Sequence, residues 1–88
     1  MNGMQELTYA YAGKLKRVSV YQNEETGEIY RSLRIAGIGA TIKVVVDAEQ
    51  ADKHQKDVGK MVIARGEQEY DAKTDRCKFL YGSVELAK

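Results

Sequence analysis

The chain has 88 residues, which is enough for one domain and too few for two separate hydrophobic cores. Its hydrophobic share of 43% and charged share of 31% are those of a folded soluble protein, which excludes an intrinsically disordered chain. A single cysteine, Cys77, excludes an intramolecular disulfide and with it the small disulfide-stabilised secreted proteins.

The net charge is only +1, so bulk electrostatics do not point to a polyanionic partner. The distribution of charge is more informative, because residues 7–23 and 29–46 carry bases without any acid. These bases are Lys14, Lys16, Arg17, Arg31, Arg34 and Lys43. Residues 47–88 hold nine acids and eight bases and are balanced. A local positive field is therefore expected over the first half of the chain only.

Residues 7–21 alternate between apolar and polar positions with a period of two, which predicts a long β-strand. Tyr11 and Leu15 share one phase of this alternation, whereas Val18 lies on the other. The phase changes near Lys16, and this change predicts a β-bulge that bends the strand across two parts of a sheet.

A polar stretch at residues 23–27 ends in glycine and predicts a hairpin to a second strand at residues 28–36. The side chains of this strand that are predicted to face the core are Ile29, Leu33 and Ile35. Those predicted to face the opposite side are Tyr30, Ser32 and Arg34. Gly37 and Gly39 end the strand, and the β-branched residues of 41–46 predict a third one.

Asp47 and Gln50 have the spacing of a capping box, which predicts a short helix that runs to Gly59. The segment is mostly polar, so two or three turns are expected to lie across one end of the sheet.

Residues 60–66 predict a fourth strand that can extend to Tyr70. After a turn at residues 71–75, residues 76–86 predict a fifth strand that bends at Gly82.

The predicted order β-β-β-α-β-β indicates an all-β domain, namely a five-stranded OB-type barrel with one short helix between strands three and four. An SH3-like barrel usually lacks a helix at this place, and a β-sandwich requires more strands. The single domain is predicted to span residues 1–88, with residues 1–6 as a flexible N-terminus.

The sequence offers few residues for catalytic or metal chemistry. A zinc site needs about four ligands, mostly Cys or His, and this chain has one of each. It has no glycine-rich phosphate loop and no nucleophile motif. His54 is predicted to be a solvated helix residue, and Cys77 a structural thiol. We therefore expect a protein without catalytic activity, cofactor or metal.

The aromatic residues favour a binding surface. The chain has six tyrosines, one phenylalanine and no tryptophan, a composition that suits half-exposed rings with hydrated hydroxyls. OB folds bind ligands across strands two and three and between the first and fourth connecting loops. The residues predicted to bind nucleic acid there are Lys14, Lys16, Arg17, Tyr21, Tyr30, Arg31, Arg34, Lys43, Tyr70, Lys73, Arg76 and Tyr81. Tyr9 and Tyr11 are interpreted as core or dimer-interface residues, and Phe79 as a core residue.

The basic hairpin at residues 14–34 and the segments TIKVVVDAEQ, DVGKMVIARG and CKFLYGSVELAK carry a resemblance. In its size and in the order of these segments, the chain is similar to the small OB-fold single-stranded DNA-binding proteins, in particular the helix-destabilising proteins of filamentous phages. The resemblance implies a homodimer that coats single strands cooperatively through tyrosines and basic residues.

Two functions stay open at this point. The favoured one is non-catalytic binding of single-stranded nucleic acid, with DNA preferred over RNA. The alternative is a protein-interaction OB module in a larger complex, which the balanced charge of residues 47–88 fits. We expect a cytoplasmic location without membrane contact, because no 18 apolar residues run together and residues 1–16 lack the order of a signal peptide.

Overall fold

The computed structural model describes residues 7–72 and 75–87. The predicted flexibility of residues 1–6 and the predicted role of Lys73 lie outside these residues. The elements are β1 (Leu7–Gln22), β2 (Ile29–Ala36), β3 (Thr41–Val46), α1 (Ala48–His54), a 3-10 turn (Gln55–Asp57), β4 (Met61–Asp71), β5 (Arg76–Leu80) and β6 (Ser83–Leu86).

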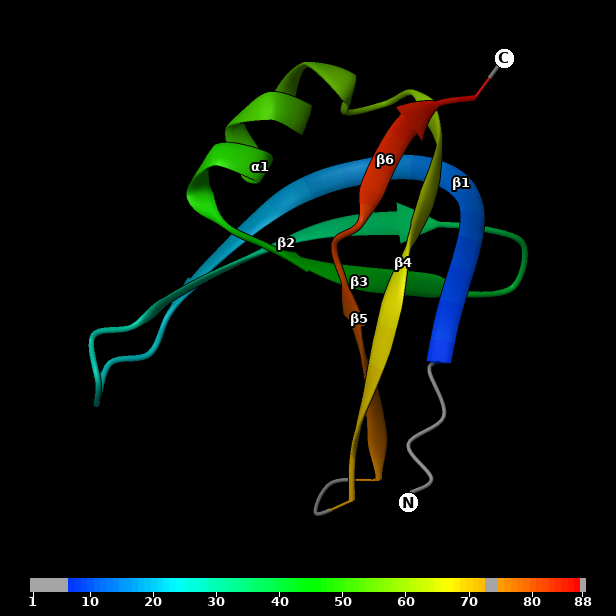
Figure 1. Ribbon diagram of the computed structural model, residues 1–88. Coiled ribbons are helices and arrows are strands. Elements are labelled where there is room, and N and C mark those ends of the chain that lie inside the picture. The colour runs from blue at the N-terminus through cyan, green and yellow to red at the C-terminus, as the bar shows by residue number, and fades with distance from the viewer. Residues whose placement is uncertain (1–6, 73–74, 88) are drawn as a thin grey trace.

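The strands close into a ring (Figure 1). β1 pairs with β4 along its first half and with β2 along its second half, β2 pairs with β3, and β5 pairs with both β3 and β4. The β3–β5 pair is parallel and the other pairs in this ring are antiparallel. With α1 between β3 and β4, this order confirms the predicted all-β, OB-type fold.

The first strand bends as its sequence predicts. The register between β1 and β2 shifts between Leu15 and Arg17, which places a β-bulge at Lys16. The bulge lies just after Lys14, the residue at which β1 leaves β4 and continues along β2. One strand of 16 residues thereby serves two sides of the ring (Figure 1).

The predicted fifth strand is two strands, β5 and β6, which are separated by Tyr81 and Gly82. Here two glycines pass close to the opposite backbone. A Cβ atom on Gly66 would lie 2.2 Å from the carbonyl oxygen of Leu80, and one on Gly82 would lie 2.5 Å from that of Arg65. Only glycine permits this close approach, because any side chain would collide with the opposite backbone. The predicted bend at Gly82 is therefore confirmed. The prediction of one continuous strand is wrong.

Aliphatic side chains fill the interior of the ring. The largest fully buried ones are Leu15, Leu33, Ile35, Val44 and Val62. The predicted inward orientation of Leu33 and Ile35 is confirmed. Ile29 was also predicted to face the core, but it is 50% exposed. It has the correct phase, yet the β1–β2 hairpin continues beyond Arg31, where the pairing with β3 ends, so no core lies beneath it.

α1 begins with the predicted capping box. The backbone N–H of Gln50 donates to the Asp47 carboxylate at 2.8 Å, and the backbone N–H of Asp47 donates to the Gln50 side chain at 3.0 Å. The α-helix ends at His54, earlier than the predicted Gly59, and lies across one end of the ring (Figure 1). Among the described residues, no helix has the length and apolar character needed to cross a bilayer.

The prediction of a solvated histidine is wrong, because His54 is 2% exposed. Its Nδ1 lies 3.2 Å from the Asp57 carboxylate and its Nε2 lies 2.8 Å from the Tyr81 hydroxyl. A carboxylate only accepts, so Nδ1 donates to Asp57, while Nε2 and the Tyr81 hydroxyl share the second hydrogen bond. The network joins the helical segment to the junction between β5 and β6.

Candidate functional site

An open groove of about 1120 Å³ runs over the outer face of β2 and β3. Two hairpins frame it, one between β1 and β2 and the other between β4 and β5 (Figure 1). The groove extends into the space where β3 and β5 separate, because these strands pair only at Val44–Phe79 and Val45–Leu80. The site therefore lies on the face that OB folds use for ligands.

Bases outnumber acids in the wall of this groove. The bases are Arg31, Arg34, Lys43, Arg76 and Lys78. Among the lining residues that the structure describes, Glu69 is the single acid. The wall of the groove is therefore locally positive, although the net charge of the chain is only +1.

The sheet register places cationic side chains next to one another. Arg17 pairs with Arg34, and Arg34 pairs with Lys43, so the three side chains form one row on the same face. Lys78 on β5 is not part of this row, because its cross-strand partner is Glu69 of β4. Like charges directly opposite one another destabilise a sheet, and an anionic ligand would relieve this repulsion. We call Arg17, Arg34 and Lys43 the cation row.

Two buried polar atoms beside the cation row have no hydrogen-bond partner within the described part of the chain. They are Nε of Arg34 and Oγ of Ser19, and both residues line the groove. Leaving a buried polar group unsatisfied costs about 1–3 kcal/mol. A ligand oxygen that accepts from Arg34 would therefore gain more than one at a solvated surface.

Tyr21 and Tyr30 form an aromatic pair at the outer end of the groove. They are cross-strand partners, their ring centroids lie 6.4 Å apart, and the ring planes differ by 23°. The residues are 63% and 48% exposed. The hydroxyl of Tyr30 donates to the Glu28 carboxylate, and this hydrogen bond raises the pKa of Tyr30. Exposed, flat rings of this kind are suited to stacking against a ligand.

A further exposed ring stands on the other hairpin. Tyr70 lies opposite Cys77 and is 52% exposed. Its hydroxyl donates to Asp75 Oδ1 at 2.5 Å, and this hydrogen bond raises the pKa of Tyr70. Cys77, predicted to be a structural thiol, is exposed and lines the groove between Arg76 and Lys78.

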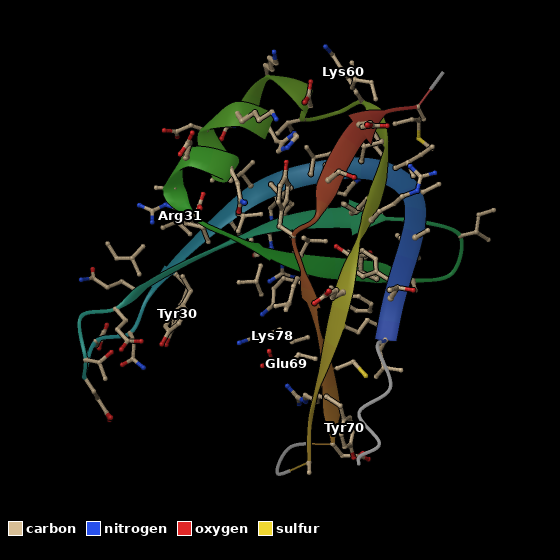
Figure 2. All side chains as sticks on the ribbon, in the orientation of Figure 1. Tyr30, Arg31, Lys60, Glu69, Tyr70 and Lys78 are labelled. Atoms are coloured by element: carbon tan, nitrogen blue, oxygen red, sulfur yellow. The ribbon has the colours of Figure 1, made fainter. Side chains whose placement is uncertain are left out.

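Seven of the predicted binding residues line the groove: Tyr21, Tyr30, Arg31, Arg34, Lys43, Tyr70 and Arg76. The phase of Arg31 is opposite to that of Tyr30, and Figure 2 shows these two side chains on different sides of the β1–β2 hairpin. Lys14, Lys16 and Arg17 are exposed on β1 without lining the groove, although Arg17 belongs to the cation row.

Tyr81 was predicted to bind nucleic acid, but the structure places it outside the groove. Its hydroxyl bonds to His54, and burial raises its pKa. The alternation of β5 predicted that it shares the environment of Phe79, but the strand ends at Leu80.

Sequence reasoning did not identify Ser19, Lys78 and Glu69 as groove residues. Lys78 could have been found from its alternation with Phe79 on β5. Ser19 and Glu69 carry no such local signal, because their proximity to β3 depends on how the ring closes.

Tyr9, Tyr11 and Phe79 pack against the core, in agreement with their interpretation as core residues. Tyr9 and Phe79 meet edge to face with centroids 5.1 Å apart, and the Tyr9 hydroxyl donates to the Leu80 carbonyl at 2.8 Å. Tyr11 donates to the Ala40 carbonyl at 2.6 Å and braces the β2–β3 turn. The hydroxyls of Tyr9 and Tyr11 thus bond to backbone carbonyls, and their rings are less exposed than those of Tyr21, Tyr30 and Tyr70.

No protein-family model matches the chain, and no curated protein matches its sequence. Across residues 7–72 and 75–87, no group of three or more His, Cys, Asp or Glu side chains is arranged to hold a metal ion. Besides cations, hydroxyls and aromatic rings, the groove holds the Glu69 carboxylate and the Cys77 thiol.

Proposed function

We propose that the protein binds single-stranded nucleic acid, DNA in preference to RNA, in the groove over β2 and β3. The observation that carries this proposal is the cation row beside the exposed Tyr21–Tyr30 pair. Cations of this kind neutralise phosphates, and aromatic rings stack on bases at about 1–3 kcal/mol per base. Binding is non-catalytic in this proposal.

A single strand suits the groove better than a duplex does. In a duplex, the faces of the bases are covered by their neighbours, so the rings of Tyr21, Tyr30 and Tyr70 would have nothing to stack on. In a single strand, these faces are free, and every base offers one. Arg34 and Lys43 would hold phosphates while the rings hold bases, which gives sequence-tolerant binding.

Titration with oligo-dT tests the proposal. Binding should quench tyrosine fluorescence, and one phosphate contact for each of the three residues of the cation row predicts a slope of about −2 for log K against log salt concentration. A duplex of the same length should bind more weakly at equal salt. Absence of binding at low salt, or equal affinity for the duplex, would contradict the proposal.

A protein-interaction module is the second candidate, and one observation favours it. Val20 and Ile29 are 63% and 50% exposed on the face of the β1–β2 hairpin opposite to Tyr21 and Tyr30. Arg31, the cross-strand partner of Val20, lies on this apolar face and also lines the groove, so the two surfaces meet at Arg31. We propose a second copy of the chain as the partner of the apolar face, in line with the homodimer that the phage resemblance implies.

Light scattering at micromolar concentration tests the dimer. We expect twice the chain mass of 9.9 kDa, and we expect Val20→Asp to give a monomer. A wild-type protein that stays monomeric at 100 μM or so would exclude a stable homodimer.

A further inference from the structure

Two exposed tyrosines at opposite ends of the groove share one arrangement. Tyr30, on the β1–β2 hairpin, donates its hydroxyl to Glu28, and Tyr70, on the β4–β5 hairpin, donates its hydroxyl to Asp75. Each carboxylate belongs to the same hairpin as its tyrosine. Figure 2 shows the two rings on separate projections of the molecule.

The hydrogen bond acts at the free end of each ring. An exposed tyrosine rotates about two side-chain torsions, and a bond at the hydroxyl restricts both of them. Tyr30 is also fixed by the neighbouring ring of Tyr21. The rings are therefore held in place before any ligand arrives, which reduces the entropy that binding must overcome.

Carboxylates are unexpected at the ends of a groove that binds a polyanion. Glu28 and Asp75 do not line the groove, but each bonds to a tyrosine that does, so their charge opposes the binding of phosphates beside these rings. The two carboxylates are explained if the affinity gained from holding the tyrosine rings in place exceeds the affinity lost to charge repulsion.

We propose that Glu28 and Asp75 are positioning residues, which hold the rings of Tyr30 and Tyr70 ready to stack on unpaired bases. This inference rests on the proposed function and deepens it, because it makes nucleobases, and not the phosphate chain alone, the chemical group that the groove selects. The hydrogen bonds exist only while the phenols are protonated, so they are intact at neutral pH and are lost well above pH 10 or so.

The inference predicts that loss of the Glu28 carboxylate affects two ligands differently. Removal of the Glu28 carboxylate should weaken binding of oligo-dT about three- to fivefold, because a preorganised ring is lost. The same change should leave binding of inorganic polyphosphate unchanged or slightly stronger, because this polymer has no bases and gains from the loss of a negative charge.

The experiment compares three variants at one salt concentration. Glu28→Ala removes the acceptor, and Glu28→Gln removes the charge but keeps an oxygen that accepts from Tyr30. Glu25→Ala is the matched control, since Glu25 is an exposed acid in the same turn, without a side-chain hydrogen bond in the described structure. We expect weaker oligo-dT binding only for Glu28→Ala.

A spectroscopic readout accompanies the binding data. The pKa of Tyr30 is raised by its hydrogen bond to Glu28, so Glu28→Ala should shift the absorbance titration of one tyrosine toward lower pH, whereas Glu25→Ala should not. At the other hairpin, Asp75→Asn keeps an acceptor and tolerates the positive φ of this residue (55°), and Asp75→Gly removes the acceptor without strain. We expect Asp75→Asn to bind oligo-dT as the wild type does, and Asp75→Gly to bind it more weakly.

The outcomes separate the two proposals. If the wild-type protein does not bind oligo-dT, the proposed function is wrong. If the wild type binds, but Glu28→Ala binds oligo-dT as tightly as Glu25→Ala does, the function stands and the positioning role is wrong. A Glu28→Gln variant that loses as much affinity as Glu28→Ala would also contradict positioning, because its amide oxygen preserves the hydrogen bond.

Discussion

Replacement of Arg34 by alanine should weaken oligo-dT binding about tenfold or more, because a hydrogen bond to a charged group contributes about 1.5–3 kcal/mol. The stability of the protein should stay the same or increase slightly. Arg34 stands between Arg17 and Lys43 in the cation row, so its removal relieves two repulsive contacts. It also removes the buried Nε atom that has no partner among the described residues.

The salt dependence distinguishes a direct phosphate contact from a general loss of charge. Loss of one contact should reduce the slope of log K against log salt by about 0.7. Arg65→Ala is the matched control, because Arg65 is exposed on β4 and does not line the groove. Equal loss of affinity in both variants would mean that net charge alone drives binding. Unfolding of Arg34→Ala would mean that this side chain belongs to the core.

The predictable part of the fold follows from side-chain alternation. A period of two fixes which face of a strand is buried, so it placed Leu33 and Ile35 inside the ring and Arg34 outside. A change of phase predicted the bulge at Lys16, since one extra residue moves every later side chain to the other face. Because the phase of alternation is a local property of one strand, the sequence carries this information.

The same reasoning fails where a side chain depends on tertiary contacts. His54 stands among polar residues, and nothing in its neighbourhood indicates burial. It is buried because α1 turns Ala51 and His54, three residues apart, toward the end of the ring. For Ile29 the error is the reverse, because burial was predicted and the side chain is exposed. Its phase is correct, but this part of the hairpin extends beyond the ring. Alternation gives the direction of a side chain and not what lies in that direction.

The candidate site was predictable in the parts that lie on one hairpin. Tyr21, Tyr30 and Arg34 belong to β1 and β2, whose pairing the turn at residues 23–27 already implies. Lys78 and Glu69 enter the groove only because β5 runs parallel to β3 and then separates from it. That arrangement depends on contacts far apart in the sequence, which a local pattern does not encode.

Replacement of His54 by alanine should lower the free energy of unfolding by about 2–4 kcal/mol. The change leaves the Asp57 carboxylate and the Tyr81 hydroxyl without their partner, and both groups are partly or fully removed from water. It also leaves a cavity at the contact between the helix and the ring. For a domain of this size, the loss is a large share of the total stability. Urea denaturation measures it.

Tyr81→Phe is the control for this network, because it removes one hydroxyl and keeps the ring that packs on the core. It should cost only about 1 kcal/mol, since His54 keeps its bond to Asp57. Equal and small losses in both variants would mean that the network contributes little and that the helix is held by Ala51 alone. We expect His54→Ala to lose much stability and, while it stays folded, to bind oligo-dT as the wild type does. This result would mean that the helix end of the ring contributes to stability and not to the proposed binding in the groove. The two regions differ in chemistry: His54, Asp57 and Tyr81 bond to one another, whereas Nε of Arg34 in the groove has no hydrogen-bond partner among the described residues.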